Sequence, residues 1–406
     1  MTDTRERTAA AAVVEEARAW LADHWRGTAD ETYRTAVVDD RWAALRWPAE
    51  WFGRGLADEQ AKEVEAVFRA AGAPGPGQDR TNLWAGTMLA GGSDELKRRF
   101  LRPLLLDQVA MCLLYSEPGA GSDLAALRTT AVRDGDDWIV NGQKVWTSGA
   151  RDAEYGMLIA RTNWDVPKHR GITFFWFPMR QPGVEVRPLR QMTGDARFNE
   201  VFITDARVPD SHRLGDEGTG WWVLQTALAY ERAVMGMVSN RRPGDAAAEP
   251  QGATAKAHGS IPIADVSLVA LARAVGKQAD PAVRQRLMRL HALRKVNEWN
   301  GQRAAAAAAA GSASPLVSLG KLSMSIILHT AGRLQGHLLG MEATLDGDEH
   351  PRARDANYSQ LNAYFFSIGG GTDQIQRNII GERVLGLPRE PEVDRDVPFR
   401  DVRASG

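Results

Sequence analysis

Glu231 is the residue whose type and surroundings most directly suggest chemistry. It lies in "LQTALAYERAVMG", a stretch with apolar residues at helical spacing. The neighbours Leu228, Ala233 and Val234 predict that much of this helix surface is buried. A buried carboxylate requires either an ion pair or a proton-transfer role with a raised pKa. Arg232 is not an automatic partner, because side chains at i and i+1 diverge on a helix, so both interpretations stay open.

A run of three glycines, Gly369 to Gly371, is the second candidate feature. It precedes a helical pattern in "FFSIGGGTDQIQRNIIGERVLGLP". Free N–H groups at a helix N-terminus can hold a phosphate or another anion. A flexible turn with Thr372 as the N-cap is the commoner interpretation. The run does not fit the dinucleotide fingerprint, because no βαβ pattern surrounds it.

Two upstream segments suit a flat, hydrogen-bonding ligand. "LLYSEPGAGSDL" begins as a strand and breaks at Pro118, which exposes backbone N–H groups and the hydroxyls of Ser116 and Ser122. "QKVWTSG" offers Trp146 as a flat wall with two hydroxyl residues beside it. A planar cofactor would suit the pair. Each segment alone also fits a β-turn or a packed tryptophan.

Metal and nucleophile signatures are absent from the sequence. The eight histidines show no HExxH spacing, and "GAGSD" does not match the G-x-S-x-G elbow. The single cysteine, Cys112, excludes an intrachain disulfide and a cysteine-based metal cluster. We therefore expect no metal site.

Composition indicates an ordinary globular protein. The 406 residues include 44% apolar residues and carry a net charge of −1, so no global field gathers nucleic acid or an anionic membrane. The N-terminus does not resemble a signal peptide. No window approaches the roughly 18 consecutive apolar residues of a membrane span. We expect a cytoplasmic protein with no nucleic-acid partner and no membrane span.

The pattern of apolar and polar residues along the chain predicts an α+β multidomain fold. Residues 1–107 have helical patterns, residues 108–214 contain short β-like runs typical of an antiparallel barrel, and residues 215–406 return to helices. Asp134-Gly135 and Asn141-Gly142 are predicted turns. Long helical patterns cover about 264–277, 281–310, 316–346 and 372–386. The intervening "NRRPGDAAAEPQGATAKAHGS" is predicted to be a loop.

Three stretches together resemble the acyl-CoA dehydrogenase family of flavoproteins over nearly the whole chain: "YSEPGAGSDLAALRTTAVRDGDDWIVNGQKVWTSGA", "PGVEVRPLRQMTGDARFNEVFITDARVP" and "GGGTDQIQRNIIGERVLGLP". The pattern is similar to actinobacterial branches that act on bulky acyl-CoAs such as steroid side chains. It implies an N-terminal helical domain, a middle β-barrel and a C-terminal four-helix bundle, with FAD between the last two. It also implies conversion of an acyl-CoA or acyl-carrier-protein thioester to its trans-2-enoyl form, with electron-transfer flavoprotein or a similar acceptor. Assembly is expected as a homodimer, a tetramer, or a heterotetramer with a paralogue.

The family's site residues carry over position by position. The resemblance implies FAD contacts from Leu113, Tyr115, Ser116, Gly121, Ser122, Trp146, Thr147, Ser148, Thr372, Asp373 and Gln374. It implies substrate contacts from Ser122, Arg232, Gly370 and Gly371. Many relatives carry the catalytic base in a Tyr-Glu-Gly-Thr motif, where this chain has Gly370. Other branches place it on an earlier helix just before an arginine, which corresponds to Glu231 as the base here.

Two departures from the family pattern leave alternatives open. The Arg-x-x-Phe-Gly segment, which reaches a neighbouring subunit's FAD pyrophosphate, is replaced by the loop "NRRPGDAAAEPQG". The glycine-rich segment for the adenosine end is replaced by "GRLQGHLLGMEA". A flavin-poor partner subunit of a heteromer is therefore one alternative, and a flavin oxidase or monooxygenase on the same fold is another. The missing side chain at Gly370 predicts a pocket that accepts a bulky acyl group.

Overall fold

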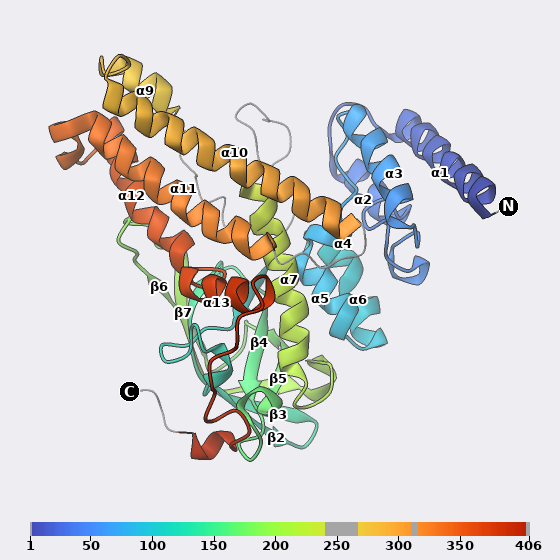
Figure 1. The fold of residues 1–406 in the computed structure, drawn as a ribbon. Coiled ribbons are helices and arrows are strands. Elements are labelled where there is room, and N and C mark those ends of the chain that lie inside the picture. Colours follow the sequence, from blue (N-terminus) through green and yellow to red (C-terminus); the bar gives the residue numbers. More distant parts are fainter. Residues whose placement is uncertain (1, 240–266, 310–315, 403–406) are drawn as a thin grey trace.

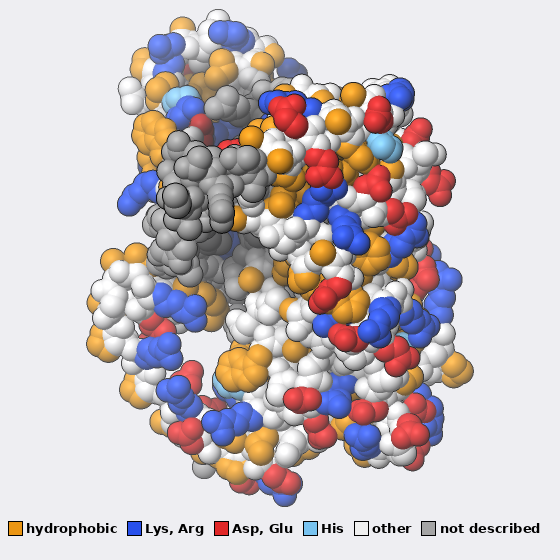
Figure 2. Space-filling view, turned by 90° about the vertical axis from the view of Figure 1, so that its right-hand side faces the viewer, with side chains coloured by type: hydrophobic (Ala, Val, Ile, Leu, Met, Phe, Trp, Pro, Cys, Tyr) orange, Lys and Arg blue, Asp and Glu red, His pale blue; other side chains and the backbone are white. Residues whose placement is uncertain are grey.

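A computed structural model describes residues 2–239, 267–309 and 316–402 (Figure 1). The N-terminal region is helical, as predicted. Its α-helices are α1 (Thr2–His24), α2 (Glu31–Asp39), α3 (Asp58–Ala70), α4 (Gln78–Thr81), α5 (Leu83–Gly91) and α6 (Asp94–Leu105). Ser93 caps α6 by accepting a hydrogen bond from the Leu96 N–H at 3.3 Å, which confirms the predicted cap. On the face that carries these helices, basic and acidic side chains are interspersed (Figure 2).

Eight strands follow and form one mixed sheet. They are β1 (Met111–Leu114), β2 (Thr130–Asp134), β3 (Asp137–Ser148), β4 (Tyr155–Arg161), β5 (Ile172–Pro178), β6 (Val184–Leu189), β7 (Phe198–Pro209) and β8 (Arg213–Leu214). The order is β6-β7-β3-β2-β4-β5-β8, with β1 also paired to β4. Strands β4 and β5 are buried on both faces, which explains their nearly continuous apolar sequences.

The predicted antiparallel barrel requires correction. Strand β4 pairs in parallel with β1 and β2, and the pairings among the described residues leave the sheet open. Asp134-Gly135 forms the predicted turn between β2 and β3, with Gly135 at φ +62°. Asn141-Gly142 is not a turn. It lies inside β3 at a bulge opposite β7, where a side chain at Gly142 would collide with Thr129.

The remaining helices cover the sheet and build the C-terminal region. They are α7 (Gly220–Ser239), α9 (Leu268–Ala274), α10 (Pro281–Ala309), α11 (Leu316–Leu339), α12 (Pro351–Ile368) and α13 (Asp373–Arg383). Figure 1 shows α7 between the N-terminal helices and the sheet, and α11 beside α10 and α12. The sequence did not predict α12. The predicted loop after α7, residues 240–260, lies outside the described residues.

The chain then returns to the sheet region through a short tail. Phe399 in the 3-10 helix Phe399–Asp401 is 2% exposed, and its ring centroid lies 3.6 Å from the Arg161 guanidinium carbon. Burial lowers the pKa of Arg161 to about 10. None of the described helices is long and apolar enough to cross a bilayer. The described residues also contain no cluster of three or more metal-ligating side chains.

Candidate functional site

Helix α7 brings Glu231 to the first of the predicted cofactor segments. Glu231 is half-buried, and its carboxylate acts electrostatically on Tyr115 at the end of β1. Burial, and then the Glu231 charge, raise the pKa of Tyr115, whose hydroxyl lies 3.6 Å from the Met157 sulfur. Tyr115 therefore stays protonated. The candidate base is therefore close enough to the start of the candidate flavin loop to act on it electrostatically, although the two lie far apart in the sequence.

Tyr230 fixes the rotation of α7 about its axis. Its ring fits over Gly86 in α5, where a built Cβ would lie 2.2 Å from the Tyr230 Cζ. The Trp47 indole donates a hydrogen bond to the Tyr230 hydroxyl. Successive helix residues point about 100° apart. Holding Tyr230 against the N-terminal helices therefore directs Glu231 toward a different neighbour, Tyr115.

The strand β3 ends in a bulge that turns Trp146 outward. Trp146 has φ +63°, and its indole is 57% exposed, whereas the adjacent Thr147 is fully buried. The Trp146 ring packs edge-on against Phe198 of β7, with centroids 5.9 Å apart. Phe198 in turn contacts Phe365 of α12 at 5.7 Å. This line of rings joins the sheet to the C-terminal helices.

The predicted glycine turn lies at the end of that line. A Cβ on Gly369 would lie 3.3 Å from the Phe365 ring. Gly370 and Gly371 have φ +65° and +86°, a conformation that costs other residues about 1–2 kcal/mol. Thr372 caps α13 by accepting from the Ile375 N–H at 3.2 Å, as predicted. A glutamate at Gly370 would thus be strained in this turn.

Asp373 ties the start of α13 to α11. One carboxylate oxygen accepts from the Lys321 ammonium at 3.2 Å and the other from the Ser325 hydroxyl at 2.8 Å. Ser325 continues to Ser367 at 2.9 Å, and Ser367 to His329 at 2.6 Å. This network joins the helix that follows the glycine turn to α11 and α12. The predicted FAD contact of Asp373 stays a prediction.

The other predicted site residues differ in how far they are exposed. Leu113 is in β1, Ser116 and Ser148 are half-buried, and Gly121, Ser122 and Gln374 are exposed. A Cβ on Gly121 would meet only open space. Thr147 keeps its hydroxyl inside the protein, without a partner among the described residues. Arg232 lies in α7, but its side chain is outside the described residues.

The sequence did not predict the line of rings or a hydrogen bond that joins α12 to the loop before β7. Phe198 and Phe365 were not predicted as site residues, and neither was Tyr358, whose hydroxyl donates to Asp195 at 3.1 Å. Tyr358 and Phe365 lie on α12, the helix that the sequence did not predict. The doublet Phe365-Phe366, two residues before the three glycines, was the available signal.

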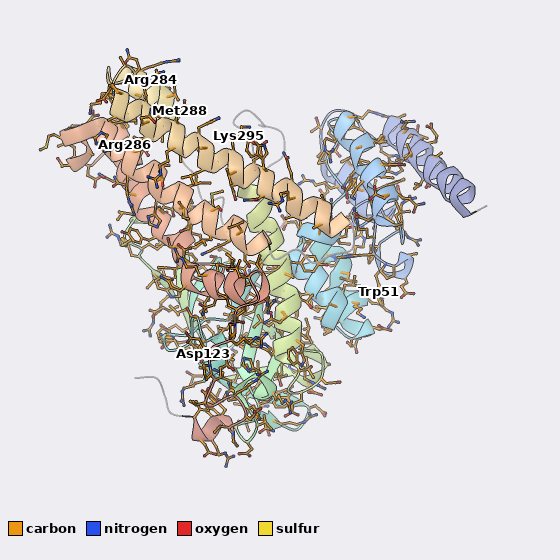
Figure 3. All side chains as sticks on the ribbon, viewed as in Figure 1. Trp51, Asp123, Arg284, Arg286, Met288 and Lys295 are labelled. Atoms are coloured by element: carbon orange, nitrogen blue, oxygen red, sulfur yellow. The ribbon has the colours of Figure 1, made fainter. Side chains whose placement is uncertain are left out.

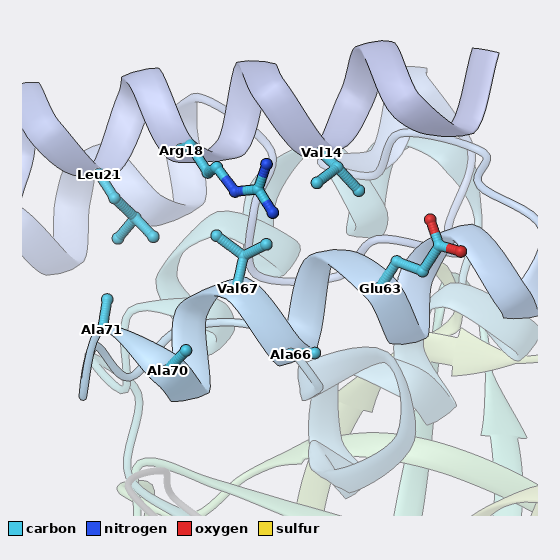
Figure 4. Close-up of a pocket in the computed structure, with 8 residues that line it drawn as sticks. All are labelled: Val14, Arg18, Leu21, Glu63, Ala66, Val67, Ala70 and Ala71. Carbon is cyan, nitrogen blue, oxygen red and sulfur yellow. The ribbon is translucent and has the colours of Figure 1, made fainter. Parts of the chain in front are cut away.

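A separate pocket lies far from these segments. It has a volume of about 630 Å³ and is found between α1 and α3 (Figure 4). Its lining is apolar apart from two charged side chains and consists of Val14, Arg18, Leu21, Glu63, Ala66, Val67, Ala70 and Ala71. It contains none of the predicted site residues.

Two family models match this chain. Residues 112–206 match the acyl-CoA dehydrogenase middle domain, and residues 266–385 match the acyl-CoA dehydrogenase C-terminal domain. Acyl-CoA dehydrogenase IpdE1 of Mycobacterium tuberculosis is 36% identical over 85% of both chains. The chain belongs to the acyl-CoA dehydrogenase family and is an oxidoreductase of that type.

Further similarities include two other proteins from Mycobacterium tuberculosis, and a third likeness supports the fold. Acyl-CoA dehydrogenase FadE34 of Mycobacterium tuberculosis is 36% identical over 89% of this chain, which spans 47% of that relative. The ChsE4-ChsE5 complex from Mycobacterium tuberculosis shares 30% identity with a TM-score of 0.61, covering 95% of this chain and 96% of the other. The Tcur3481-Tcur3483 steroid ACAD, at 24% identity, TM-score 0.69 and coverage of 94% and 98%, supports the fold.

Family membership indicates FAD as the cofactor, and the residues present fit it. An exposed indole is a suitable wall for a planar ring, and Trp146 offers one beside the Ser148 hydroxyl. At the end of the line of rings, Gly370 and Gly371 carry no Cβ, so a ligand can approach the backbone closely. The start of α13 supplies N–H groups for polar atoms.

Proposed function

We propose that this chain dehydrogenates a bulky, branched or cyclic acyl-CoA to its trans-2-enoyl thioester, with Glu231 as the base. The observation that supports this most is the electrostatic effect of Glu231 on Tyr115, which precedes the predicted flavin loop, while the glycine turn carries no carboxylate. Removal of the α-proton requires a base within hydrogen-bond reach, but the helix that supplies it is free to vary.

Each group has a defined task in this proposal. The Glu231 carboxylate takes the α-proton, and the C–H electrons become the new double bond as a hydride leaves the β-carbon. FAD, when bound, would supply the acceptor for that hydride. The Gly370 N–H donates to the thioester carbonyl, where negative charge develops. Trp146 and the Ser116–Ser122 loop hold the ring. We propose electron-transfer flavoprotein, or a similar carrier, as the final acceptor.

Substrate size is the first prediction. Because Gly370 leaves space where other relatives carry a glutamate, we expect a higher kcat/KM for a branched or cyclic acyl-CoA than for butyryl-CoA. The measurement is product formation by mass spectrometry, as a loss of two hydrogens, across a panel of thioesters with an artificial electron acceptor. A preference for butyryl-CoA over all bulky thioesters would refute the size argument. Absence of any enoyl product would refute the proposed reaction.

The exposed face of α10 supports assembly with a second, non-identical chain. Met288, Val296 and Trp299 are 59%, 49% and 57% exposed and lie at helical spacing. Figure 3 shows Arg284, Arg286 and Met288 together near one end of this helix, with Lys295 further along. Helix α10 contains six Lys or Arg residues and one Glu. Two identical copies would place like charges opposite each other, whereas an acidic paralogue would be complementary.

Assembly is the second prediction. Light scattering of the chain with an acidic paralogue from the same genome should give a heteromer of at least one copy of each. Trp299→Ser should weaken it, because an aromatic anchor is lost from the apolar stripe. Trp222→Ser is the matched control, since Trp222 is 62% exposed on α7. A monomer in the presence of every tested paralogue would contradict the proposal.

A further inference from the structure

A buried ion pair lies directly behind the two segments that face the predicted flavin. Lys144 is fully buried in β3, two residues before Trp146, and the Glu117 side chain is 9% exposed in the loop after β1. The Lys144 ammonium donates to a Glu117 carboxylate oxygen at 2.8 Å and to the Tyr115 carbonyl at 3.0 Å. These are positions that the proposed mechanism does not use.

The carboxylate of Glu117 gathers further donors. The backbone N–H groups of Arg128 and Thr129 donate to its two oxygens at 2.7 and 2.9 Å. Burial would raise the pKa of Glu117, but the Lys144 charge and these hydrogen bonds together lower it. Glu117 is therefore ionised at neutral pH. The Lys144–Glu117 pair therefore binds both ends of the segment 115–129: Lys144 binds the Tyr115 carbonyl, and Glu117 binds the N–H groups of Arg128 and Thr129.

A backbone bond completes the connection between the segments. The Val145 N–H donates to the Ser116 carbonyl at 2.9 Å, so β3 and the loop are joined one residue from Trp146. Removing one charge of a buried pair leaves its partner uncompensated and is strongly destabilising. These bonds connect the conformation of the loop after β1 to the part of β3 where Trp146 turns outward.

We propose that Lys144 and Glu117 form a clamp that positions the Ser116–Ser122 loop and the Trp146–Ser148 segment relative to each other for FAD binding. The proposal rests on the proposed function for the identity of the ligand. Both are positioning residues, since neither is placed against substrate or cofactor. The clamp explains why two charges are kept inside the protein where an apolar pair would also fill the space.

The test uses the full chain with FAD as the probe. Lys144→Met should raise the FAD dissociation constant about 10–100-fold, the equivalent of losing charge-assisted hydrogen bonds. It should also change the circular dichroism of the bound flavin's visible band. In the double variant Glu117→Gln/Lys144→Met, thermal stability should recover, because no unpaired charge remains. Its FAD affinity should stay low, because an amide can accept only one of the two N–H groups that Glu117 binds.

Arg46→Met is the matched control. Arg46 pairs with the buried Asp79 at 2.9 Å in the N-terminal region, so its loss lowers stability without touching either segment. FAD affinity that falls in step with thermal stability in every variant, control included, would overturn the clamp. Parent-like FAD affinity and flavin dichroism in Lys144→Met would also overturn it.

Hydrogen exchange separates failure of the clamp from failure of the proposed function. Lys144→Met should increase amide exchange in both residues 115–129 and residues 145–148 of the FAD-free chain, whereas Arg46→Met should not. If the parent binds no FAD, the proposed function fails while this exchange result still decides the clamp. Faster exchange in neither segment, or in one alone, would show that they are not coupled and would refute it.

Discussion

Glu231→Gln should reduce the rate of flavin reduction by about 10²–10⁴-fold, the usual contribution of a general base. FAD binding and folding should be unchanged, since glutamine keeps the size of the side chain. The α-proton next to a thioester is weakly acidic, so its removal needs a positioned carboxylate. Stopped-flow absorbance of the flavin with a saturating bulky acyl-CoA measures the effect.

Glu217→Gln is the matched control for that experiment. Glu217 is exposed just before α7, outside the group of segments that meet at Tyr115. The flavin of the Glu217→Gln variant should be reduced at the parent rate. If Glu231→Gln bleaches its flavin as fast as the parent, the base has been assigned to the wrong residue. Asp373 would then be the next candidate, and its bonds to Lys321 and Ser325 would have to break.

Gly86→Ala should impair both stability and catalysis. The new Cβ would lie 2.2 Å from the Tyr230 ring, so the ring or α7 must shift. Overpacking of this kind costs about 1–3 kcal/mol of unfolding free energy. Because Glu231 follows Tyr230 directly, α7 carries the shift to the base. A displacement of about 1 Å can cost about 10²-fold in rate. Denaturant unfolding and flavin reduction measure the two effects.

Gly320→Ala provides the comparison within the C-terminal helices. Gly320 lies in α11, where the nearest atom to a built Cβ is the Asn297 Oδ1 at 3.9 Å. Space is available, so the alanine should stabilise the helix by up to about 1 kcal/mol and leave the rate unchanged. Parent-like stability and rate in Gly86→Ala would show that Tyr230 does not set the position of Glu231.

Local sequence patterns predicted most of the elements that carry the site. Strands β4 and β5 were predicted from β-branched and aromatic runs, and the caps Ser93 and Thr372 from their side chains. Helix α12 was missed, because its polar and aromatic residues alternate without a clear apolar stripe. Pro351 at its start and Gly369 at its end were the usable signals. The open sheet could not be predicted, because strand pairing depends on contacts between distant segments.

In the site, too, single residues could be recognised from their own segments, whereas the contacts between distant segments could not be predicted. Trp146 and Glu231 stand out in their own segments, one as an aromatic beside hydroxyls and the other as a carboxylate in an apolar helix. The contacts that place them involve Phe198 with Phe365, and Tyr230 with Gly86. Nothing in either partner's local sequence specifies the other. Only the packed helices and sheet bring them together.

Anaerobic mixing of the FAD-loaded chain with a bulky acyl-CoA tests the central claim most directly. The flavin's visible absorbance and the mass of the thioester are followed together in a single turnover. We expect the absorbance to bleach while one enoyl thioester, lighter by two hydrogens, forms for each FAD reduced. A flavin that stays oxidised across the acyl-CoA panel, with every thioester unchanged, would contradict the assignment of this chain as a bulky acyl-CoA dehydrogenase.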